Sequence, residues 1–553
     1  MPNAYTRSLR TPTPQREPEN SRQVANSAGG YTFTTDNRIQ RFLILGTTGG
    51  SFYAGESKLT KENLKHVTEA ITSAPDGGVR VVQMAREISI EGRAYSNSPA
   101  LVTLALVLVH GSPEAKSAAV AALRLVARTS THLFEFAEYV ESVGGWGRTK
   151  RTAVANWYTS QTPDRLAYQV IKYRQRNGWT HRDLFRLAHP KGIDRHIGEF
   201  VLKGTITEDG PEYLKSFRLA QESVNLTDIL LTIEGAAVHG GLVWEAIPTK
   251  FLKEPEVWKK LFYNGQLRGQ ALIRNITRLA RIGAFDDMVF THDYAKMLTD
   301  KLMIQATRLH PINYLNAYVV HQTGQVPHRT KSAYGYSGAR QKDWNTNPVI
   351  LSALDEGFYS SFKYIQSANK RTFIGLDVSG SMSGMAMGLD LSCAQVGAAF
   401  SLAVAKSEPF YQIYGFSDGT RRGGWGRVGN TTHLTDLGIA PSMDLSTVMS
   451  KTSGLTFGRT DCALPMKFAL EHKIAVDTFI IVTDNETWFG DIHPHVALQK
   501  YRQAMGINAR LVVVAVASNG FTIADPTDDG SIDVVGFDSA TPKVIADFSA
   551  GRI

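Results

Sequence analysis

The 553-residue chain lacks several features that would place it quickly in a protein class. It has only two cysteines, Cys393 and Cys462, and neither has a CxxC partner, which excludes a disulfide framework and a cysteine zinc site. No run of about 18 apolar residues predicts a transmembrane helix. Residues 1–25 are polar, contain no apolar signal core and predict a disordered arm. Few cysteines and no export signal predict a cytoplasmic protein with no membrane partner.

Nucleotide-binding motifs are also missing, although residues 371–553 alternate strand and helix patterns as a Rossmann-like domain does. Neither a Gly-rich dinucleotide fingerprint nor a Walker A sequence occurs there, which disfavours nucleotide binding. The strand candidates are 372–377, 410–416, 478–483 and 511–517. The helix candidates are 392–406, 461–472, 495–505 and 541–549.

Asp377, Ser379 and Ser381 form an Asp-x-Ser-x-Ser motif directly after the first of these strands. Thr460 lies in a polar turn before a helix pattern, and Asp484 ends another apolar strand. Ligands of parallel sheets sit at the carboxyl ends of the strands, so we expect all five side chains to converge there. They offer only oxygen, which predicts a site for a divalent metal ion such as Mg²⁺.

The first two-thirds of the chain is predicted to be helical. From about residue 36 to 323, amphipathic helix patterns follow one another with short connections, as in an α-solenoid of HEAT or armadillo type. Ser98-Pro99 and Ser112-Pro113 are expected helix starts, and one helix is expected to run from Thr162 to Asn177-Gly178. Residues 324–347 read as a long exposed connection, and 348–368 as a further helix.

Basic charge is confined to this helical region. Residues 371–553 contain 14 Lys and Arg against 18 Asp and Glu, and the preceding 370 residues contain 46 against 33, a net charge of +13. This asymmetry predicts a polyanionic partner for the helical region.

Two basic clusters stand out within it. In the first, aromatic and histidine residues alternate with cations, which suits phosphate contacts together with base stacking. It comprises Lys172, Arg174, Arg176, Arg182, Arg186 and His189, with Lys172 and Arg176 expected on one helix face. In the second, Arg274, Arg278 and Arg281 are expected to form a ridge opposite a leucine stripe on a helix from Gly265 to Arg281.

Several strings resemble the Ro ribonucleoprotein autoantigen family, in a bacterial form. The TROVE module of that family is matched by Asn26-Ser-Ala-Gly-Gly-Tyr31, Thr131-His-Leu-Phe134 and Lys172-Tyr-Arg-Gln-Arg-Asn-Gly-Trp179. Further matches are Thr483-Asp-Asn-Glu-Thr487 and Ser518 to Pro526, so the resemblance extends from about residue 26 to the C-terminus. One departure is Arg459, where the family has Gly before the Thr-Asp pair.

The resemblance implies a ring-shaped α-solenoid of HEAT-like repeats (26–369) followed by a von Willebrand factor A-like domain (370–553) with a metal-ion-dependent adhesion site. It implies binding of Y RNA on the outer surface, carried over here to Lys172, Arg176 and His189. It also implies capture of single-stranded 3′ ends of misfolded RNAs in a central hole, and RNA quality control and stress-related RNA degradation with exoribonucleases. A ring closed within one chain predicts a monomer.

Two other functions remain open on the residues themselves. A metal-dependent protein-adhesion scaffold would use the Asp377 motif without any RNA role. A metal-dependent nuclease would use Asp377, Asp484 and Glu486, but the site is rich in hydroxyls and has no evident general base. We therefore expect binding rather than catalysis. The role of the basic segment 420–430 stays open.

Overall fold

The computed structural model describes most of the chain, and all structural statements below concern these residues. They are 35–46, 51–53, 61–91, 94, 96–307, 309, 311–324, 343–361, 367–384, 391–417, 433–453, 460–483, 492–515, 523–525, 528–535 and 541–552. The chain divides into two compact units. The helical unit contains Thr60–Leu309 and Val320–Gly357, and the α/β unit contains the described residues of Met1–Leu59, His310–Val319 and Phe358–Ile553.

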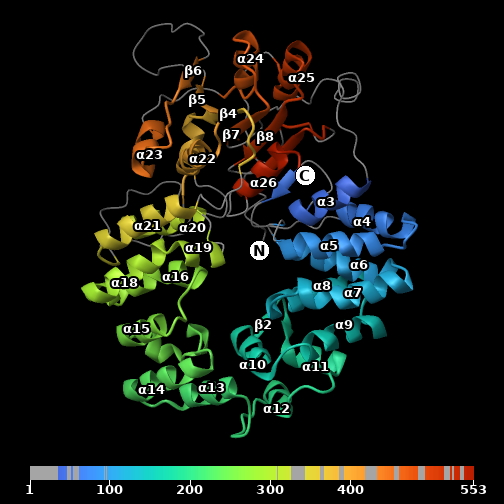
Figure 1. Ribbon diagram of the computed structural model, residues 1–553, viewed down its shortest axis with the longest axis vertical. Coiled ribbons are helices and arrows are strands. Elements are labelled where there is room, and N and C mark those ends of the chain that lie inside the picture. Colours follow the sequence, from blue (N-terminus) through green and yellow to red (C-terminus); the bar gives the residue numbers. More distant parts are fainter. Residues whose placement is uncertain are drawn as a thin grey trace. The chain divides into compact units, whose positions relative to one another are not determined.

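The helical unit is built from short helices that pack on their neighbours along the chain (Figure 1). Its helices are α4 (Lys61–Ser73), α5 (Val79–Glu91), α6 (Ser98–His110), α7 (Pro113–Val126), α8 (Ser130–Gly144), α9 (Arg148–Thr159), α10 (Pro163–Lys172), α11 (His181–Ala188), α12 (Arg195–Lys203), α13 (Glu212–Glu222), α14 (Leu226–Ala236), α15 (Pro255–Tyr263), α16 (Gln270–Arg274), α17 (Ile276–Arg281), α18 (Met288–Thr299) and α19 (Lys301–Thr307). The helices α20 (Pro311–Thr323) and α21 (Pro348–Ser361) are each divided between the two units. The predicted helical architecture is confirmed.

Helix starts follow the side-chain chemistry of the first turn. Ser112 caps α7, where its side chain accepts a hydrogen bond from the Ala115 amide ahead of Pro113. For α6 the prediction was one residue late, because Asn97 is the N-cap and Ser98 is already helical. The Asn97 side chain instead donates to the Val126 carbonyl and accepts from Ser89, so it ties α6 to its neighbours.

The predicted helix from Thr162 to Gly178 is wrong in its last turn. α10 ends at Lys172, and the chain continues as a hairpin of β2 (Gln175–Arg176) and β3 (Trp179–Thr180). Asn177 and Gly178 both have positive φ (52° and 78°), as the two central residues of a tight hairpin turn require. Lys172 and Arg176 therefore do not share a helix face.

The predicted helix from Gly265 to Arg281 is interrupted. It forms α16 and α17, which meet at Asn275. Asn275 is buried, and its side-chain amide donates to the Ala271 carbonyl at 2.8 Å. Such a local side-chain bond competes with the helical backbone pattern, which accounts for the break.

The α/β unit contains a seven-stranded sheet in the order β1-β9-β8-β7-β4-β5-β6. All neighbours are parallel except β5 and β6. The predicted strands are confirmed as β4 (Thr372–Asp377), β5 (Tyr411–Ser417), β7 (Thr478–Thr483) and β8 (Arg510–Ala515). The strands β1 (Ser51–Tyr53), β6 (His433–Asp436) and β9 (Ser531–Val535) were not predicted.

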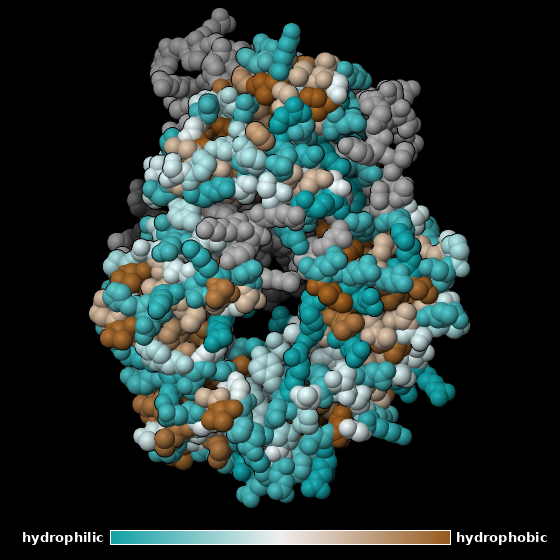
Figure 2. All heavy atoms as spheres, in the orientation of Figure 1, coloured by the Kyte–Doolittle hydropathy of each residue, from teal (hydrophilic) through white to brown (hydrophobic). Residues whose placement is uncertain are grey.

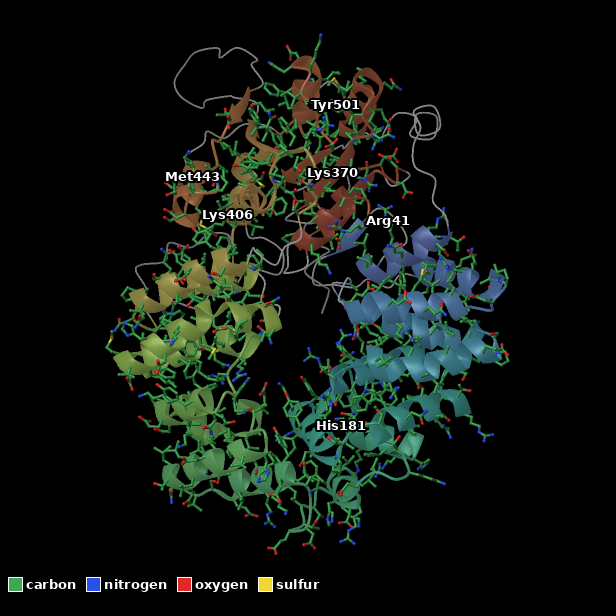
Figure 3. The ribbon with its side chains drawn as sticks, viewed as in Figure 1. Arg41, His181, Lys370, Lys406, Met443 and Tyr501 are labelled. Carbon is green, nitrogen blue, oxygen red and sulfur yellow. The ribbon has the colours of Figure 1, made fainter. Side chains whose placement is uncertain are left out.

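Two segments preceding the helical unit join the α/β unit. β1 pairs with the edge strand β9, and α3 (Thr35–Leu45) packs beside it. On α3, the guanidinium of Arg41 is paired with the Asp529 carboxylate at 2.8 Å and lies over the Phe548 ring (Figure 3). The sequence had assigned these segments to the helical region, because a three-residue strand carries no readable period.

Helices cover both faces of the sheet. α24 (Leu464–Glu471) and α25 (Pro494–Met505) pack on the face that carries Phe373, Phe479 and Leu511. α22 (Cys393–Ser407) and α26 (Thr541–Ser549) pack on the other face, beside Thr372 and Ile480. One more helix of this unit, α23 (Leu445–Ser453), packs on α22.

Close approach of the helices to β4 depends on two glycines. A Cβ at Gly375 would lie 2.5 Å from Pro465 of α24, and a Cβ at Gly397 of α22 would lie 2.5 Å from Leu376. β4 is therefore clamped from both faces, which fixes the position of its carboxyl end at Asp377.

Three predicted segments lie wholly or largely outside the described residues: 1–25, 325–342 and 420–430. The last part of the predicted connection, 343–347, is not fully exposed, since Trp344 is buried and donates to the His321 carbonyl. The predicted helix 348–368 is described to Ser361 as α21, and residues 362–366 lie outside. Among the described helices, none has the length and apolar character to cross a membrane.

Candidate nucleic-acid interface and metal centre

The carboxyl end of β4 presents a buried carboxylate held by hydroxyl and amide donors. Asp377 is 1 % exposed. Its Oδ1 accepts from the Ser379 amide at 2.8 Å. Ser379 and Ser381 then bring their hydroxyl oxygens within 3.0 Å of each other on the turn that follows. The Asp-x-Ser-x-Ser motif thus places its three side chains at one strand end, as predicted.

Two threonines from neighbouring segments complete this cluster. Thr460 Oγ1 lies 3.4 Å from Asp377 Oδ2, and Thr483 Oγ1 at the end of β7 donates to the same oxygen at 2.9 Å. Next to Thr460, Asp461 accepts from the Ala463 amide and so fixes the turn before α24. Asp484 lies outside the described residues, so its predicted convergence is not placed.

Thr483 was missed by the sequence analysis, although it directly precedes a predicted ligand. The parallel pairing of β4 with β7 was the signal that could have found it. Parallel register brings the ends of adjacent strands to the same edge of the sheet.

The donor chemistry of this cluster fits a hard divalent cation. It comprises one buried carboxylate and the hydroxyls of Ser379, Ser381, Thr460 and Thr483, and Mg²⁺ prefers oxygen ligands of this kind. Ser381 is exposed, so one side of the cluster faces solvent. His, Cys, Asp and Glu do not gather in threes anywhere in the described part of the chain.

In the helical unit, α11 carries a basic stripe along one face. Arg182, Arg186 and His189 follow at intervals of four and three residues, and all three are exposed. Neither arginine forms an ion pair within the described residues. Arg176 on the preceding hairpin is exposed as well. We call Arg176, Arg182, Arg186 and His189 the α11 stripe.

The N-terminus of α11 is fixed by a capping box. The Thr180 side chain accepts from the Asp183 amide, and the Asp183 carboxylate accepts from the Thr180 amide, as the sequence predicted. At the other end, His189 has a positive φ of 45° and its amide donates to the Phe185 carbonyl. Both ends of the short helix are therefore held, which orients its exposed arginines.

A buried histidine anchors the hairpin to α11. His181 Nε2 lies 3.1 Å from the Tyr173 carbonyl and its Nδ1 lies 2.8 Å from the Tyr158 hydroxyl. Because a carbonyl can only accept, Nε2 is the donor and Nδ1 accepts from Tyr158. Burial lowers the pKa of His181 to about 4 and raises that of Tyr158. His181 is thus a neutral structural residue (Figure 3).

Lys172 and Arg174 contact other parts of the unit. Lys172 Nζ donates to the Tyr168 hydroxyl at 2.8 Å and lies over the Tyr168 and Tyr173 rings. Arg174 is exposed, and its guanidinium lies 5.1 Å from the centre of the Phe217 ring on α13. The predicted first cluster is therefore divided, with these two residues set apart by their contacts from the α11 stripe.

The second predicted cluster spans the break between α16 and α17. Arg274, Arg278 and Arg281 are all exposed, while Leu272, Ile276 and Leu279 are buried. The guanidinium of Arg278 lies over both Trp244 and Trp258, and Arg281 pairs with Asp343 at 2.7 Å. Cation–π contact leaves the hydrogen-bonding edge of Arg278 available to an anion.

The comparisons with known proteins agree with both halves of this description. A family model described as the TROVE domain matches residues 24–221 and 239–334, and one described as the Ro60 vWA domain matches residues 371–549. The chain is 35 % identical over 555 residues to the RNA-binding protein RO60 of Deinococcus radiodurans, covering 98 % of each chain. It is 32 % identical over 619 residues to the RNA-binding protein RO60 of Caenorhabditis elegans, covering 98 % of this chain and 92 % of that one.

A solved structure extends the agreement to the fold. The crystal structure of the Deinococcus radiodurans RO (RSR) protein superposes with a TM-score of 0.79 at 33 % identity, covering 94 % of this chain and 100 % of that one. The resemblance stated from the sequence motifs is therefore confirmed. With a helical TROVE region followed by a mixed α/β vWA domain, the chain belongs to the Ro60 family.

Proposed function

We propose that this protein binds RNA through the α11 stripe of its helical unit. The observation that carries the proposal is the row of exposed arginines, Arg176, Arg182 and Arg186, which form no ion pair within the described residues. Unpaired guanidinium groups on a net-positive region favour phosphate contacts. The names of the two relatives, each an RNA-binding protein, support the same function.

The RNA we propose is of two kinds. One is a small structured noncoding RNA of the Y RNA type, held on the α11 stripe. The other is misfolded RNA with a single-stranded 3′ end, delivered to an exoribonuclease in RNA quality control and stress-related degradation. The protein acts by binding, as a cytoplasmic monomer, and carries out no catalysis itself.

For the α/β unit we propose a Mg²⁺ site at Asp377, Ser379, Ser381 and Thr460, with Asp484 as the fifth ligand. The oxygen-only donor set around a buried carboxylate supports this assignment. A bound ion would supply an open coordination position to a partner's carboxylate or stabilise the strand ends. The test is thermal unfolding with and without Mg²⁺.

We expect Mg²⁺ to raise the unfolding temperature of the wild type and to leave that of Asp377→Ala unchanged. Binding of the ion to the folded state alone produces this shift. Ser446→Ala is the control, since Ser446 bonds to Asp444 at the start of α23 and is not in the cluster. An equal Mg²⁺ shift in Asp377→Ala would refute the ligand assignment.

RNA binding is tested with three RNAs across a salt series: a hairpin, the same hairpin with a single-stranded 3′ tail, and the tail alone. We expect the tailed hairpin to bind most tightly, with affinity that falls steeply as salt rises. Equal affinity for all three would remove the proposed preference for free ends. Binding that survives high salt would instead favour a protein-adhesion scaffold without an RNA role.

A further inference from the structure

A pocket of about 550 Å³ lies beside the α11 stripe in the helical unit. One wall is a single face of α9, and the other is the end of α11 with the turn that follows. Its lining residues are Trp146, Arg148, Arg151, Thr152, Ala155, Asn156, Thr159, Ala188, His189 and Lys191. The volume falls within the roughly 300–1,000 Å³ that small-molecule sites occupy.

The charge of this pocket has one sign. Arg148, Arg151 and Lys191 are exposed, and none forms an ion pair within the described residues. The described lining contains no Asp or Glu. Like charges so close to one another repel, and an anion between them relieves that repulsion. The pocket is therefore complementary to a phosphate.

The pocket also has an aromatic wall. Trp146 is half-buried and meets the Trp179 ring of the hairpin edge-on, with 5.6 Å between ring centres. Its indole Nε1 is buried and has no acceptor among the described residues. A ligand that stacks on this ring and lets the nitrogen reach an acceptor would stabilise it. A nucleobase offers both a flat face and acceptor atoms.

The start of α9 adds a further preference for anions. Its N-cap is Gly147, which has no side chain to satisfy the first amides, and its first turn contains no acidic residue. The partial positive charge of the helix N-terminus therefore adds to the charges of Arg148 and Arg151. The surface around α11 and α12 is mostly hydrophilic (Figure 2), in keeping with a charged ligand.

We propose that the pocket between α9 and the end of α11 binds one unpaired ribonucleotide of an RNA whose duplex lies on the α11 stripe. The base stacks on Trp146, and the phosphates lie among Arg148, Arg151 and Lys191. His189 belongs to both the stripe and the pocket wall, which makes the two surfaces continuous. This inference rests on the proposed RNA-binding function and adds a preference for unpaired nucleotides.

The experiment measures the affinity of the full chain for two RNA hairpins that differ by one unpaired nucleotide in the stem. We expect the hairpin with the unpaired nucleotide to bind about tenfold more tightly, which corresponds to a stacking contribution at the lower end of the usual range. Trp146→Ala should remove this difference while leaving the paired hairpin's affinity unchanged. Trp146→Phe should restore most of it, because a phenyl ring still stacks.

Arg151→Ala separates charge from stacking. It should weaken the hairpin with the unpaired nucleotide several-fold and lower its salt slope by about one. Arg124→Ala is the matched control, since Arg124 is an exposed arginine on α7 that does not line the pocket. The control should change neither hairpin.

The outcomes distinguish this inference from the function on which it rests. If the wild type binds both hairpins equally with a steep salt dependence, the RNA-binding function stands and the pocket assignment fails. If neither hairpin binds, the proposed function itself fails. Displacement of the RNA by a large excess of AMP would overturn the assignment in favour of a free-nucleotide site, and the proposal predicts that AMP has no such effect.

Discussion

The helical unit and the α/β unit place polar chemistry in opposite ways. In the helical unit, the candidate side chains are exposed arginines at the ends and faces of short helices, and buried neutral residues such as His181 hold them in place. In the α/β unit, the candidate carboxylate is itself buried, at the end of a strand clamped by helices on both faces. One unit thus displays charge, and the other encloses it.

The charge balance of the two regions follows the same division. The first 370 residues carry a net +13, and residues 371–553 carry −4. A positive surface gains affinity for polyanions over many weak contacts, each sensitive to salt. A buried oxygen cluster gains affinity for one cation from a few short contacts, which salt screens little. The predictions below test whether the two units are separable in this sense.

The largest effect is expected on the exposed side. The double variant Arg182→Ala with Arg186→Ala should weaken binding of a structured RNA on the order of 100-fold, because each arginine loses a charge-assisted hydrogen bond of about 1.5–3 kcal/mol. Its salt slope should fall by about two. Fluorescence anisotropy with labelled RNA across a salt series measures both.

The control for that variant is Arg86→Ala with Arg124→Ala, which removes two exposed arginines elsewhere in the helical unit. An equal loss of affinity in the control would mean that net charge, and not the α11 stripe, drives binding.

Enclosure of the β4 end predicts a loss of stability on a small change in packing. Gly397→Ala would place a Cβ 2.5 Å from Leu376, so α22 must move away from β4. We expect the α/β unit to lose about 1–3 kcal/mol of unfolding free energy, as overpacked cores do. Urea unfolding followed by tyrosine and tryptophan fluorescence measures it, and a variant as stable as the wild type would contradict the clamped arrangement.

The buried histidine predicts how the helical unit responds to acid. The pKa of His181 is about 4 in the folded protein against an ordinary 6.5, so the unfolded chain binds more protons between these values. Its contribution to stability is therefore complete above pH 6.5 and is lost as the pH falls towards 4. At pH 5 the loss is about 2 kcal/mol.

The variant that checks this is His181→Gln, whose amide can still donate to the Tyr173 carbonyl and accept from Tyr158. Thermal unfolding between pH 7 and 5 should show a shallower decline in the variant than in the wild type. Identical pH profiles would mean that His181 does not carry the dependence.

The smallest effect is expected at an open site in the helical unit. Gly235 lies within α14, and a Cβ there would have no neighbour within 4 Å. Gly235→Ala should raise the unfolding free energy by about 0.5–1 kcal/mol, because alanine loses less backbone freedom in a helix. The same substitution thus has opposite signs at Gly235 and Gly397, and chemical denaturation of both variants checks the contrast.

The sequence was a better guide to the α/β unit than to the helical unit. Four strands and the cluster at Asp377, Ser379, Ser381 and Thr460 were predicted, because a buried parallel strand is a contiguous apolar run and its ligands follow it directly. β1 was missed since three residues carry no period, and β9 because Asp533 interrupts its apolar run. Thr483 needed the strand pairing itself.

In the helical unit the errors came from turns. Lys172 and Arg176 were assigned to one face because helical spacing was extended through Asn177-Gly178, where the backbone instead forms a hairpin. The pocket at Trp146 was missed for a different reason. The basic segment from Trp146 to Arg151 was visible in the sequence, but its partner wall at His189 and Lys191 is brought near only by the packing of α11 on α9.

The most direct test of the central claim is one binding measurement on three full-length proteins: wild type, Asp377→Ala, and Arg182→Ala with Arg186→Ala. Affinity for a structured RNA is measured at constant Mg²⁺ and salt. The account predicts that Asp377→Ala binds as tightly as the wild type and that the arginine variant binds on the order of 100-fold more weakly. Equal weakening by Asp377→Ala would show that the two sites are not separable, and an arginine variant with wild-type affinity would remove the α11 stripe as the RNA site.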